Sequence, residues 1–579
     1  NTAFGYNSLT ANTTANNNTA FGYESAKANT TGTQNTAIGK SALEANTTGG
    51  SNVAVGFSAL AANTTAASNV AVGTFSLDAN TTGAGNVAVG TNALTANTTA
   101  SNNAAFGNGA LEANTTGDNN VAVGATALDA NTTGSANTGV GRDALTVNTT
   151  GSNNVAVGVA ALEQNNGAYN VAVGKDALKA NTTAEENTAM GNDAMLDNTT
   201  GANNVAVGSS ALANNTTASN NVAVGRHALL TNTTGTELTA VGGTALDANT
   251  TGGDNTAVGY GALGANTTAS SNVAVGNVAL AANTTGPQNV AVGAGALQTQ
   301  TTSEYNTAVG YRAGYLITTG LQNTYVGGQA GYASTTGNYN VGVGVNALAS
   351  QTTASNNTTL GYASGDNITT GGGNTNIGGL SGGAVSTGTN NTCLGYSAGS
   401  VLASGASNNI AIGKSAVTAS SNPSHTIIIG TDATALNENN QFAFGNDSLG
   451  IVHNNFDANA SWTRTSDERK KTNITDDHLG LNFINKLRPV TFNWKPNYEL
   501  PKEFRDYAEE NVKDTETVLH GMIAQDVKAA LDKEGVDTFG GWMEDDTGAQ
   551  RLAQEMFIYP LINAVKELSA KVEALENKE

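Results

Sequence analysis

The sequence predicts a mainly β protein in which a long parallel β-solenoid is followed by a small α+β domain. A 17-residue pattern recurs from Asn1 to about residue 450. Charged residues make up only 12% of the 579 residues, about half of their usual share in globular domains. Aromatic residues, at 5%, are too few to fill the several globular cores that this length would otherwise suggest. The chain is also poorer in charge and Pro than disordered low-complexity sequence usually is.

Each repeat follows the consensus N-[VT]-A-V-G-x-x-A-L-x-x-N-T-T-G-x-x, whose positions we number 1 to 17. The units continue in steps of 17 from Asn1, except that the unit between Asn154 and Asn170 is one residue short. Looser units close the series, the last of them at His425 and Gln441, which gives 27 units in all. A short repeat of fixed length is the signature of a solenoid in which each unit stacks on its neighbours.

Each unit is expected to form one rung with two extended segments, N-V-A-V-G and A-L-x-x-N-T-T, because Val, Thr, Gly and Asn form helices poorly. Position 4 is apolar in every unit, so we expect it to point into the solenoid and to meet the Leu of position 9. The Ala of position 3 then faces outward, since side chains alternate along a strand. A small residue on an outer face favours the close approach of another backbone. We therefore expect a homotrimer with the Ala-bearing faces near the shared axis.

The Asn-Thr-Thr triplets of most repeats allow two interpretations. Every triplet, beginning with the one at Asn12, is formally a glycosylation sequon. The triplet also occupies one fixed phase of the repeat, where the chain must turn. Asn and Thr side chains can bond the backbone of such turns and stack as ladders between rungs. We favour the ladders.

Composition also excludes several kinds of site. The first 465 residues carry 9 basic and 22 acidic residues, so no basic patch is present to bind nucleic acid. No apolar run approaches the length that spans a membrane. The single cysteine, Cys393, rules out an intrachain disulfide framework and is expected to be a small buried residue. The five His residues have no metal-ligand spacing, so we predict neither a metal nor a cofactor.

From Thr465 onward the chain is non-repetitive and can carry chemistry. It reads T-S-D-E-R-K-K-T-N-I-T-D, then L-N-F-I-N-K-L-R-P-V-T-F-N-W-K, H-G-M-I-A-Q-D-V and Y-P-L-I-N-A-V-K-E-L. A turn between Ser466 and Lys471 can bring the amine to the hydroxyl, and a desolvated lysine can act as general base for a serine nucleophile. His520 and Gln525 are weaker candidates for orienting groups or oxyanion contacts. A solvated, charged surface turn is the alternative interpretation of S-D-E-R-K-K.

Both parts of the chain resemble known families. The repeat resembles the head repeats of trimeric autotransporter adhesins, which build parallel β-rolls, and repeats of phage and viral fibre proteins. The four C-terminal blocks, over residues 466–579, closely resemble the intramolecular chaperone domain of phage tail fibres and endosialidases, with its pattern S-D-x-x-x-K-x-N-I, L-x-P-V-x-F-x-W and G-x-I-A-Q-E/D-V. This second resemblance implies a self-cleaving serine endopeptidase that acts once, with a Ser-Lys dyad. The cut would fall between Thr465 and Ser466, and Asp467 would help to shape the site.

The last segment predicts a helix with a coiled-coil stripe. Leu561, Val565, Leu568, Val572 and Leu575 follow the 4, 3, 4, 3 spacing of a and d positions. Barely two heptads are too short to be stable alone, so the stripe favours assembly of several chains. An amphipathic helix that packs on its own domain is the alternative.

We therefore expect three regions: a shaft at 1–450, a connector at 451–465 and a C-terminal domain at 466–579. Within the last region we expect helices at 479–487 and 524–534 and a strand at 490–494. The resemblances imply a structural and adhesive trimeric fibre of a phage or virus, whose last domain directs trimerisation. Such a fibre would be made in the host cytoplasm and would lie outside the cell on the virion, as a tail or surface fibre.

The expected partners are two further copies of the chain and a host cell-surface glycan or protein receptor. Because the chain begins in mid-pattern without Met, we also expect a missing N-terminal region that attaches to other virion or tail proteins. A bacterial trimeric surface adhesin and a polysaccharide depolymerase tailspike are the alternatives. A depolymerase needs two carboxylates that face one groove. The acidic residues of the repeats, such as Glu112 and Asp129, instead occupy variable turn positions, so we do not expect the shaft to be an enzyme.

Overall fold

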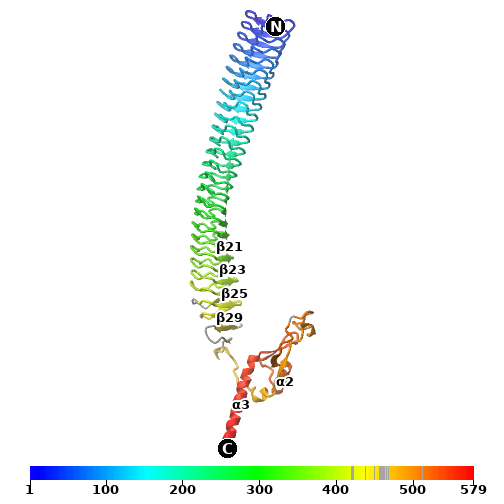
Figure 1. Ribbon diagram of the computed structural model, residues 1–579, viewed down its shortest axis with the longest axis vertical. Helices are drawn as coiled ribbons and strands as arrows, with labels where there is room; N and C mark the ends of the chain where they lie inside the picture. The colour runs from blue at the N-terminus through cyan, green and yellow to red at the C-terminus, as the bar shows by residue number, and fades with distance from the viewer. Residues whose placement is uncertain are drawn as a thin grey trace. The chain divides into compact units, whose positions relative to one another are not determined.

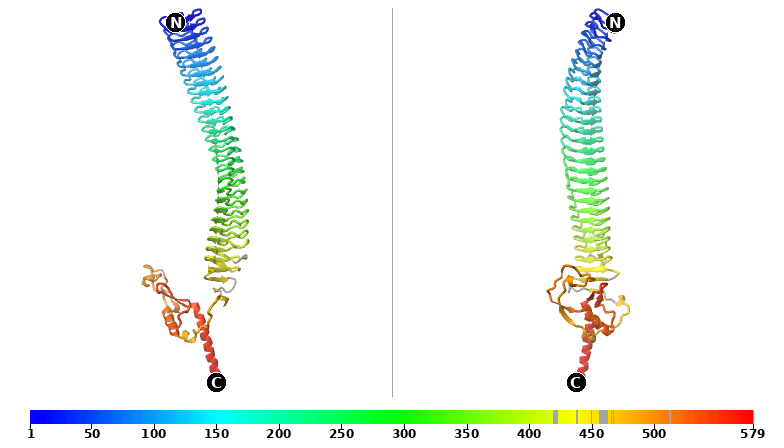
Figure 2. Two further views of the ribbon diagram at one scale, coloured as in Figure 1. Left: turned by 180° about the vertical axis from the view of Figure 1, so that it is seen from behind. Right: turned by 90° about the vertical axis from the view of Figure 1, so that its right-hand side faces the viewer.

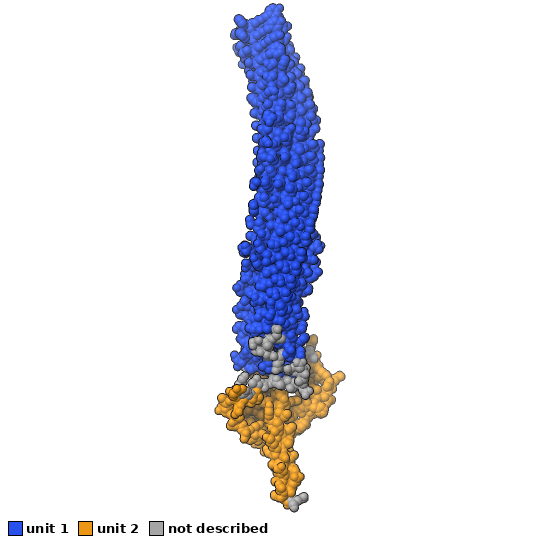
Figure 3. Space-filling model, turned by 90° about the vertical axis from the view of Figure 1, so that its left-hand side faces the viewer, with its two compact units in different colours: residues 1–465 blue, residues 466–579 orange. Residues whose placement is uncertain are grey.

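The computed structural model describes the chain except for residues 419–422, 437–438, 449, 456–462, 465, 467, 512 and 579. The chain divides into two compact units, Asn1–Thr465 and Ser466–Glu579, which are coloured separately in Figure 3. We call them the shaft and the C-terminal domain.

The shaft is a stack of rungs, and each rung as far as β27 contributes one three-residue strand to a long sheet (Figures 1 and 2). Successive strands pair in parallel with like positions opposite each other, as Val53 is opposite Val70 and Ala54 opposite Ala71. The predicted mainly β, parallel solenoid is thus confirmed, with about 26 turns. The strands are β1 (Thr2–Phe4), β2 (Thr19–Phe21), β3 (Thr36–Ile38), β4 (Val53–Val55), β5 (Val70–Val72), β6 (Val87–Val89), β7 (Ala104–Phe106), β8 (Val121–Val123), β9 (Thr138–Val140), β10 (Val155–Val157), β11 (Val171–Val173), β12 (Thr188–Met190), β13 (Val205–Val207), β14 (Val222–Val224), β15 (Thr239–Val241), β16 (Thr256–Val258), β17 (Val273–Val275), β18 (Val290–Val292), β19 (Thr307–Val309), β20 (Thr324–Val326), β21 (Val341–Val343), β22 (Thr358–Leu360), β23 (Thr375–Ile377), β24 (Thr392–Leu394), β25 (Ile410–Ile412) and β27 (Ile427–Ile429).

The interior of the shaft is lined by positions 3 and 9. Ala54 and Leu60, at these positions of one rung, are both fully buried, and the same holds along the stack. The expectation that position 4 points inward and Ala outward is therefore wrong. The reason is the size of the side chain at position 3. A Cβ atom added to Gly139, at this position, would lie 3.3 Å from Cδ1 of Leu128. The interior leucines therefore leave space for a side chain little larger than a methyl group. An Ala-bearing face near a trimer axis is excluded for the same reason.

The side chains of positions 2 and 4 form the outer face of the sheet, which we call the valine face. Both positions are half-buried or exposed in every strand from β3 to β25, while position 3 between them is buried. Large apolar side chains on this face, such as Phe106 and Leu360, are 42% and 49% exposed. The single chain therefore presents an apolar stripe along the whole shaft.

The predicted second extended segment is absent from most rungs. Positions 6 to 11 form turns instead, with left-handed backbone at positions 7 and 9, as at Ser41 (φ 56°) and Leu43 (φ 55°). These residues still bond to the next rung: the Leu43 N–H donates to the Ala59 carbonyl over 3.0 Å. Hydrogen bonds between rungs thus continue through the turns, although no strand is formed there. They pair the backbone N–H and carbonyl groups of residues in a left-handed conformation that L-residues otherwise avoid.

Two columns of buried asparagine connect the rungs, as the favoured interpretation of the triplets expects. At position 1, Asn35 accepts the Asn52 N–H through Oδ1 (2.9 Å) and donates from Nδ2 to the Gly49 carbonyl (2.9 Å). At position 12, Asn46 donates from Nδ2 to Asn29 Oδ1 (2.7 Å). Asn46 is fully buried, so its amide is inaccessible to a glycosyl donor in the folded rung.

The last rungs depart from the repeat. β26 (Val417–Thr418) and β28 (Thr434–Ala435) form an extra parallel pair. β29 (Gln441–Asn446) pairs in parallel with β27 and in antiparallel with β30 (Gly450–Asn455), which pairs in turn with β31 (Thr463–Arg464). Residues 451–455, which the sequence assigns to the connector, therefore extend the sheet.

The C-terminal domain is a small α+β unit with one apolar core. Leu479, Phe483, Val527, Leu531 and Phe557 are its main buried side chains. Helix α2 has the predicted bounds, whereas the helix expected at 479–487 is shorter. The elements are η1 (Glu468–Lys470), α1 (Leu481–Ile484), β32 (Pro489–Phe492), η2 (Asn497–Glu499), β33 (Leu519–Met522), α2 (Ala524–Glu534), β34 (Trp542–Glu544), β35 (Gln550–Leu552), η3 (Gln554–Phe557) and α3 (Ile558–Glu576).

A carboxylate holds the turn between β34 and β35. Asp545 Oδ1 accepts hydrogen bonds from the Thr547 hydroxyl (2.6 Å), the Thr547 N–H (3.0 Å) and the Ala549 N–H (3.1 Å). These bonds, led by the hydroxyl and helped by nearby Arg551, lower the pKa of Asp545 to about 2. Hydrogen bonds to the charged form favour that form, so the turn depends on an ionised Asp545.

Candidate functional site

Ser466 and Lys471 lie together at the start of the C-terminal domain. The Lys471 ammonium donates a hydrogen bond to Ser466 Oγ over 2.7 Å. The 3₁₀ turn η1 produces this contact, because the Lys471 N–H donates to the Glu468 carbonyl (2.9 Å) and folds the chain back on itself. Both side chains are exposed, so the desolvated lysine that the sequence predicts is not found in the single chain. A serine hydroxyl this close to a lysine amine has the geometry of a nucleophile next to its base.

The structure does not bring the other predicted site residues to this pair. His520 lies in β33 opposite Thr491, and Gln525 lies in the first turn of α2; both are exposed. Among the described residues, no hydrogen bond joins either of them to Ser466 or Lys471. Gln525 lines a separate cavity of about 590 Å³ together with Trp494. Thr465 and Asp467 lie outside the described residues.

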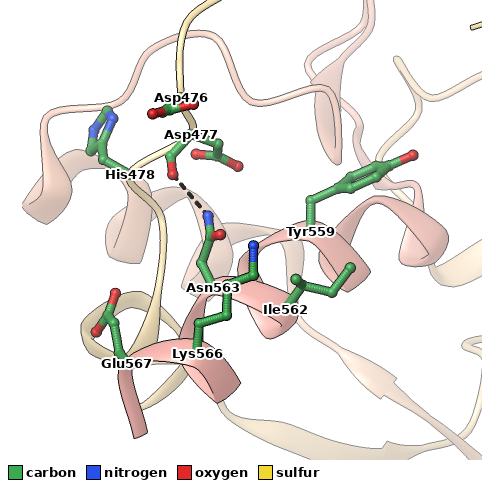
Figure 4. A pocket seen from close by; sticks show the side chains of 8 residues that line it. All are labelled: Asp476, Asp477, His478, Tyr559, Ile562, Asn563, Lys566 and Glu567. Atoms are coloured by element: carbon green, nitrogen blue, oxygen red, sulfur yellow. Dashed lines mark hydrogen bonds between the residues drawn. The ribbon is translucent and has the colours of Figure 1, made fainter. Parts of the chain in front are cut away.

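Helix α3 holds the segment at residues 476–481, which follows the Ser466–Lys471 pair in the chain. The sequence did not predict these contacts. Asn563 donates from Nδ2 to the carbonyls of Asp477 (2.8 Å) and Leu479 (3.2 Å), and Figure 4 shows the first of these bonds. Glu567, one turn later, accepts the Leu481 N–H (3.2 Å) at the start of α1. The contacts span 84 to 86 residues of sequence, so no local pattern indicates them.

A cavity of about 530 Å³ lies between this segment and α3 (Figure 4). The segment supplies two carboxylates and an imidazole, and the helix adds a lysine and a glutamate, so the lining is highly polar. The lining residues are Asp476, Asp477, His478, Tyr559, Ile562, Asn563, Lys566 and Glu567.

The opposite face of α3 carries the predicted coiled-coil stripe. Pro560 and Ala564 are the buried residues of α3, whose contacts include α1. The stripe residues are not among these buried residues and are about half exposed or more. Their exposures are 48% for Leu561, 58% for Val565, 50% for Leu568, 46% for Val572 and 65% for Leu575. The stripe is therefore largely open to solvent in the single chain.

The acidic side chains at position 10 of the shaft are less solvated than the sequence suggests. Burial raises the pKa of Asp129, and repulsion from Glu112 on the preceding rung adds to the shift. Burial likewise raises the pKa of Asp78 and Asp247.

Within the described residues, His, Cys, Asp and Glu form no group of three or more that could hold a metal ion. Cys393 is fully buried, as predicted, and burial raises its pKa to about 12.

The chain combines a repetitive β-solenoid with a non-repetitive C-terminal domain that begins at the hydrogen-bonded pair Ser466 and Lys471. Residues 466–536 match the family model described as chaperone of endosialidase, a family of self-cleaving intramolecular chaperone domains. The match begins at the residue where the second compact unit begins. This match and the 17-residue solenoid together fit a phage tail fibre or tailspike-like protein with an intramolecular chaperone domain. The resemblance predicted from the sequence is thus confirmed.

No curated protein and no solved structure matches the chain significantly. Among the helices that the structure describes, none combines the length and the apolar character needed to cross a membrane.

Proposed function

We propose that the chain is one subunit of a homotrimeric phage or viral fibre whose C-terminal domain directs assembly and then releases itself by cutting between Thr465 and Ser466. The shaft is the structural and adhesive part. The observation that carries the proposal is the 2.7 Å hydrogen bond between Lys471 and Ser466, at the first residue of the family match.

The dyad can cut the chain without a cofactor. Ser466 Oγ attacks the carbonyl carbon of Thr465 while the amine of Lys471, once deprotonated, takes the hydroxyl proton. The bond from that carbon to the Ser466 nitrogen then breaks, and Lys471 returns the proton to the leaving amine. Water hydrolyses the resulting ester, which leaves a carboxylate on Thr465 and a free amino group on Ser466. The reaction occurs once per chain.

Two apolar surfaces support assembly into a trimer. Parallel sheets are almost always covered on both faces, yet in the single chain only the inner face of this sheet is covered and the valine face is open. An apolar stripe of this length is more than a monomer usually exposes. The stripe on α3 is a second such surface, with coiled-coil spacing. We place the valine faces, and not the alanines, toward the neighbouring chains.

Register explains why a fibre would need an assembly domain. A shift of three chains by one whole rung keeps almost every contact in a shaft of near-identical rungs. A unique sequence at one end, with a helix that aligns three copies, removes this ambiguity before the rungs stack. Once the shaft has formed, the domain is dispensable, and cleavage makes assembly hard to reverse. Host receptors and other virion or tail proteins are the further partners that we propose.

The test is the intact mass of the full chain and of three variants after purification. We expect two fragments from the wild type, with a new N-terminus at Ser466, and an uncut chain from Ser466→Ala and from Lys471→Ala. Lys470→Ala, the matched control, should still be cut. All variants should sediment as the same oligomer as the wild type. Cleavage at Ser466 in the Ser466→Ala variant, or an uncut wild type, would contradict the dyad.

A further inference from the structure

Tyrosine is concentrated in one part of the shaft. Six of the 15 tyrosines of the chain lie between residues 305 and 339. Tyr325 is buried in the core, and the other five are at the surface. Two of those five, Tyr311 and Tyr315, lie beside a single basic residue, Arg312, and a third, Tyr332, stacks on Tyr315. We call these four residues the Arg312 cluster.

The cluster holds a guanidinium group between aromatic rings. Cζ of Arg312 is 5.1 Å from the ring centroid of Tyr311 and 5.2 Å from that of Tyr315. Tyr332, one rung further, stacks on Tyr315 with centroids 5.3 Å apart and ring planes 6° from parallel. Tyr311 is 54% exposed. Cation–π contacts of this kind hold the guanidinium by its face, and Arg312 is half-buried.

The charge of Arg312 is not compensated by the shaft. In the described part of the chain, its side chain has no ion pair and no hydrogen bond, so its five N–H donors are unused. Position 7 of the adjacent rungs is neutral, with Gly295 before it and Gln329 after it. Lys27 and Lys175 pair with carboxylates instead, whereas Lys40 contacts the rings of Tyr23 and Phe57.

We propose that the Arg312 cluster binds a carboxylated pyranose of an acidic surface glycan. The unused N–H groups form a planar fork that matches a carboxylate in two parallel hydrogen bonds. The exposed ring of Tyr311 can stack on the apolar face of the sugar. The shaft as a whole is acidic, so an anion needs a local cation such as Arg312 in order to bind. Three copies per fibre would raise the avidity. The inference rests on the proposed adhesive function of the shaft.

The experiment uses the full chain on an array of carboxylated and neutral oligosaccharides of matched size. We expect the wild type to bind carboxylated members in preference to neutral ones. Arg312→Gln should weaken this binding roughly tenfold or more, the usual effect of losing a charged hydrogen bond, and Tyr311→Ala should also weaken it. Arg226→Gln is the matched control, because it removes the same charge from the shaft in a rung without tyrosine; it should change binding less than twofold.

Three results would overturn the inference: no carboxylated sugar bound, equal losses in Arg312→Gln and Arg226→Gln, or binding of neutral sugars that survives Arg312→Gln. Sedimentation of the same samples separates the inference from the proposed function. A wild type that assembles but binds no acidic sugar contradicts only the inference, whereas a wild type that does not assemble contradicts the proposed fibre.

Discussion

Replacing a position 5 glycine tests the rung geometry most sharply, and the chain offers two adjacent glycines for the comparison. Gly327, at position 5, has φ 134°, and a Cβ there would lie 2.5 Å from the carbonyl oxygen of Gly344 on the next rung. Gly328 has no atom within 4 Å of its Cβ position, and its φ lies outside the left-handed range. Gly327→Ala should therefore combine backbone strain of about 1–3 kcal/mol with a clash against backbone that cannot rotate away.

We expect Gly327→Ala to lower the free energy of unfolding by roughly 3 kcal/mol or more, since strain and overlap add. Gly328→Ala should be neutral or stabilise by up to about 1 kcal/mol, because alanine restricts the unfolded chain. Urea unfolding followed by circular dichroism measures the difference. Hydrogen exchange should place the damage of Gly327→Ala at β20 and β21. If the two variants unfold within about 0.5 kcal/mol of each other, the rungs are not stacked as closely as described.

Three further changes test other parts of the account. Asn204→Ala removes the acceptor of the buried Asn221 N–H (3.0 Å) and should cost about 2 kcal/mol in urea unfolding; an unchanged midpoint would contradict the asparagine columns. Asp545 has a folded pKa of about 2, below its ordinary 3.8, so its contribution to stability is present above pH 4 and is lost as the pH falls toward 2. Hydrogen exchange of the β34–β35 hairpin should show this loss in the wild type and not in Asp545→Asn. Leu568→Glu, on the exposed stripe of α3, should reduce the sedimenting oligomer, whereas Lys571→Glu on the same helix should not; equal behaviour would exclude the stripe as an interface.

The period and the parallel register follow from the sequence because a fixed 17-residue repeat leaves one way to stack. The 27 units counted in the sequence correspond to about 26 turns of the solenoid. Which side chains of the strand point inward does not follow from the sequence. In V-A-V all three side chains are apolar, so hydrophobicity cannot decide which ones point inward, and the size of the interior leucine decides it instead. One signal was present: where position 9 is Gly331 or Gly399, position 3 becomes the larger Tyr325 or Cys393. Such exchanges between two positions show that they share one space.

The candidate site was partly predictable for a similar reason. Ser466 and Lys471 are five residues apart, so a local turn suffices to join them, and the sequence indicates this turn. Asn563 and Glu567 act across more than 80 residues, and nothing in the local sequence marks them. The left-handed turns of the shaft were missed because residues other than glycine occupy positions 7 and 9 in most rungs, although Gly295 at position 7 and Gly331 at position 9 are in the same left-handed region and carried the signal.

The central claim is that the C-terminal domain aligns the chains before the shaft forms. The most direct measurement is the sedimentation of residues 1–465 expressed without the domain, beside the full chain and the uncut Ser466→Ala variant. The account predicts a defined trimer for both full-length proteins and misassembled or insoluble material for residues 1–465. A soluble trimer of residues 1–465 with the same sedimentation and rung register as the full chain would contradict it.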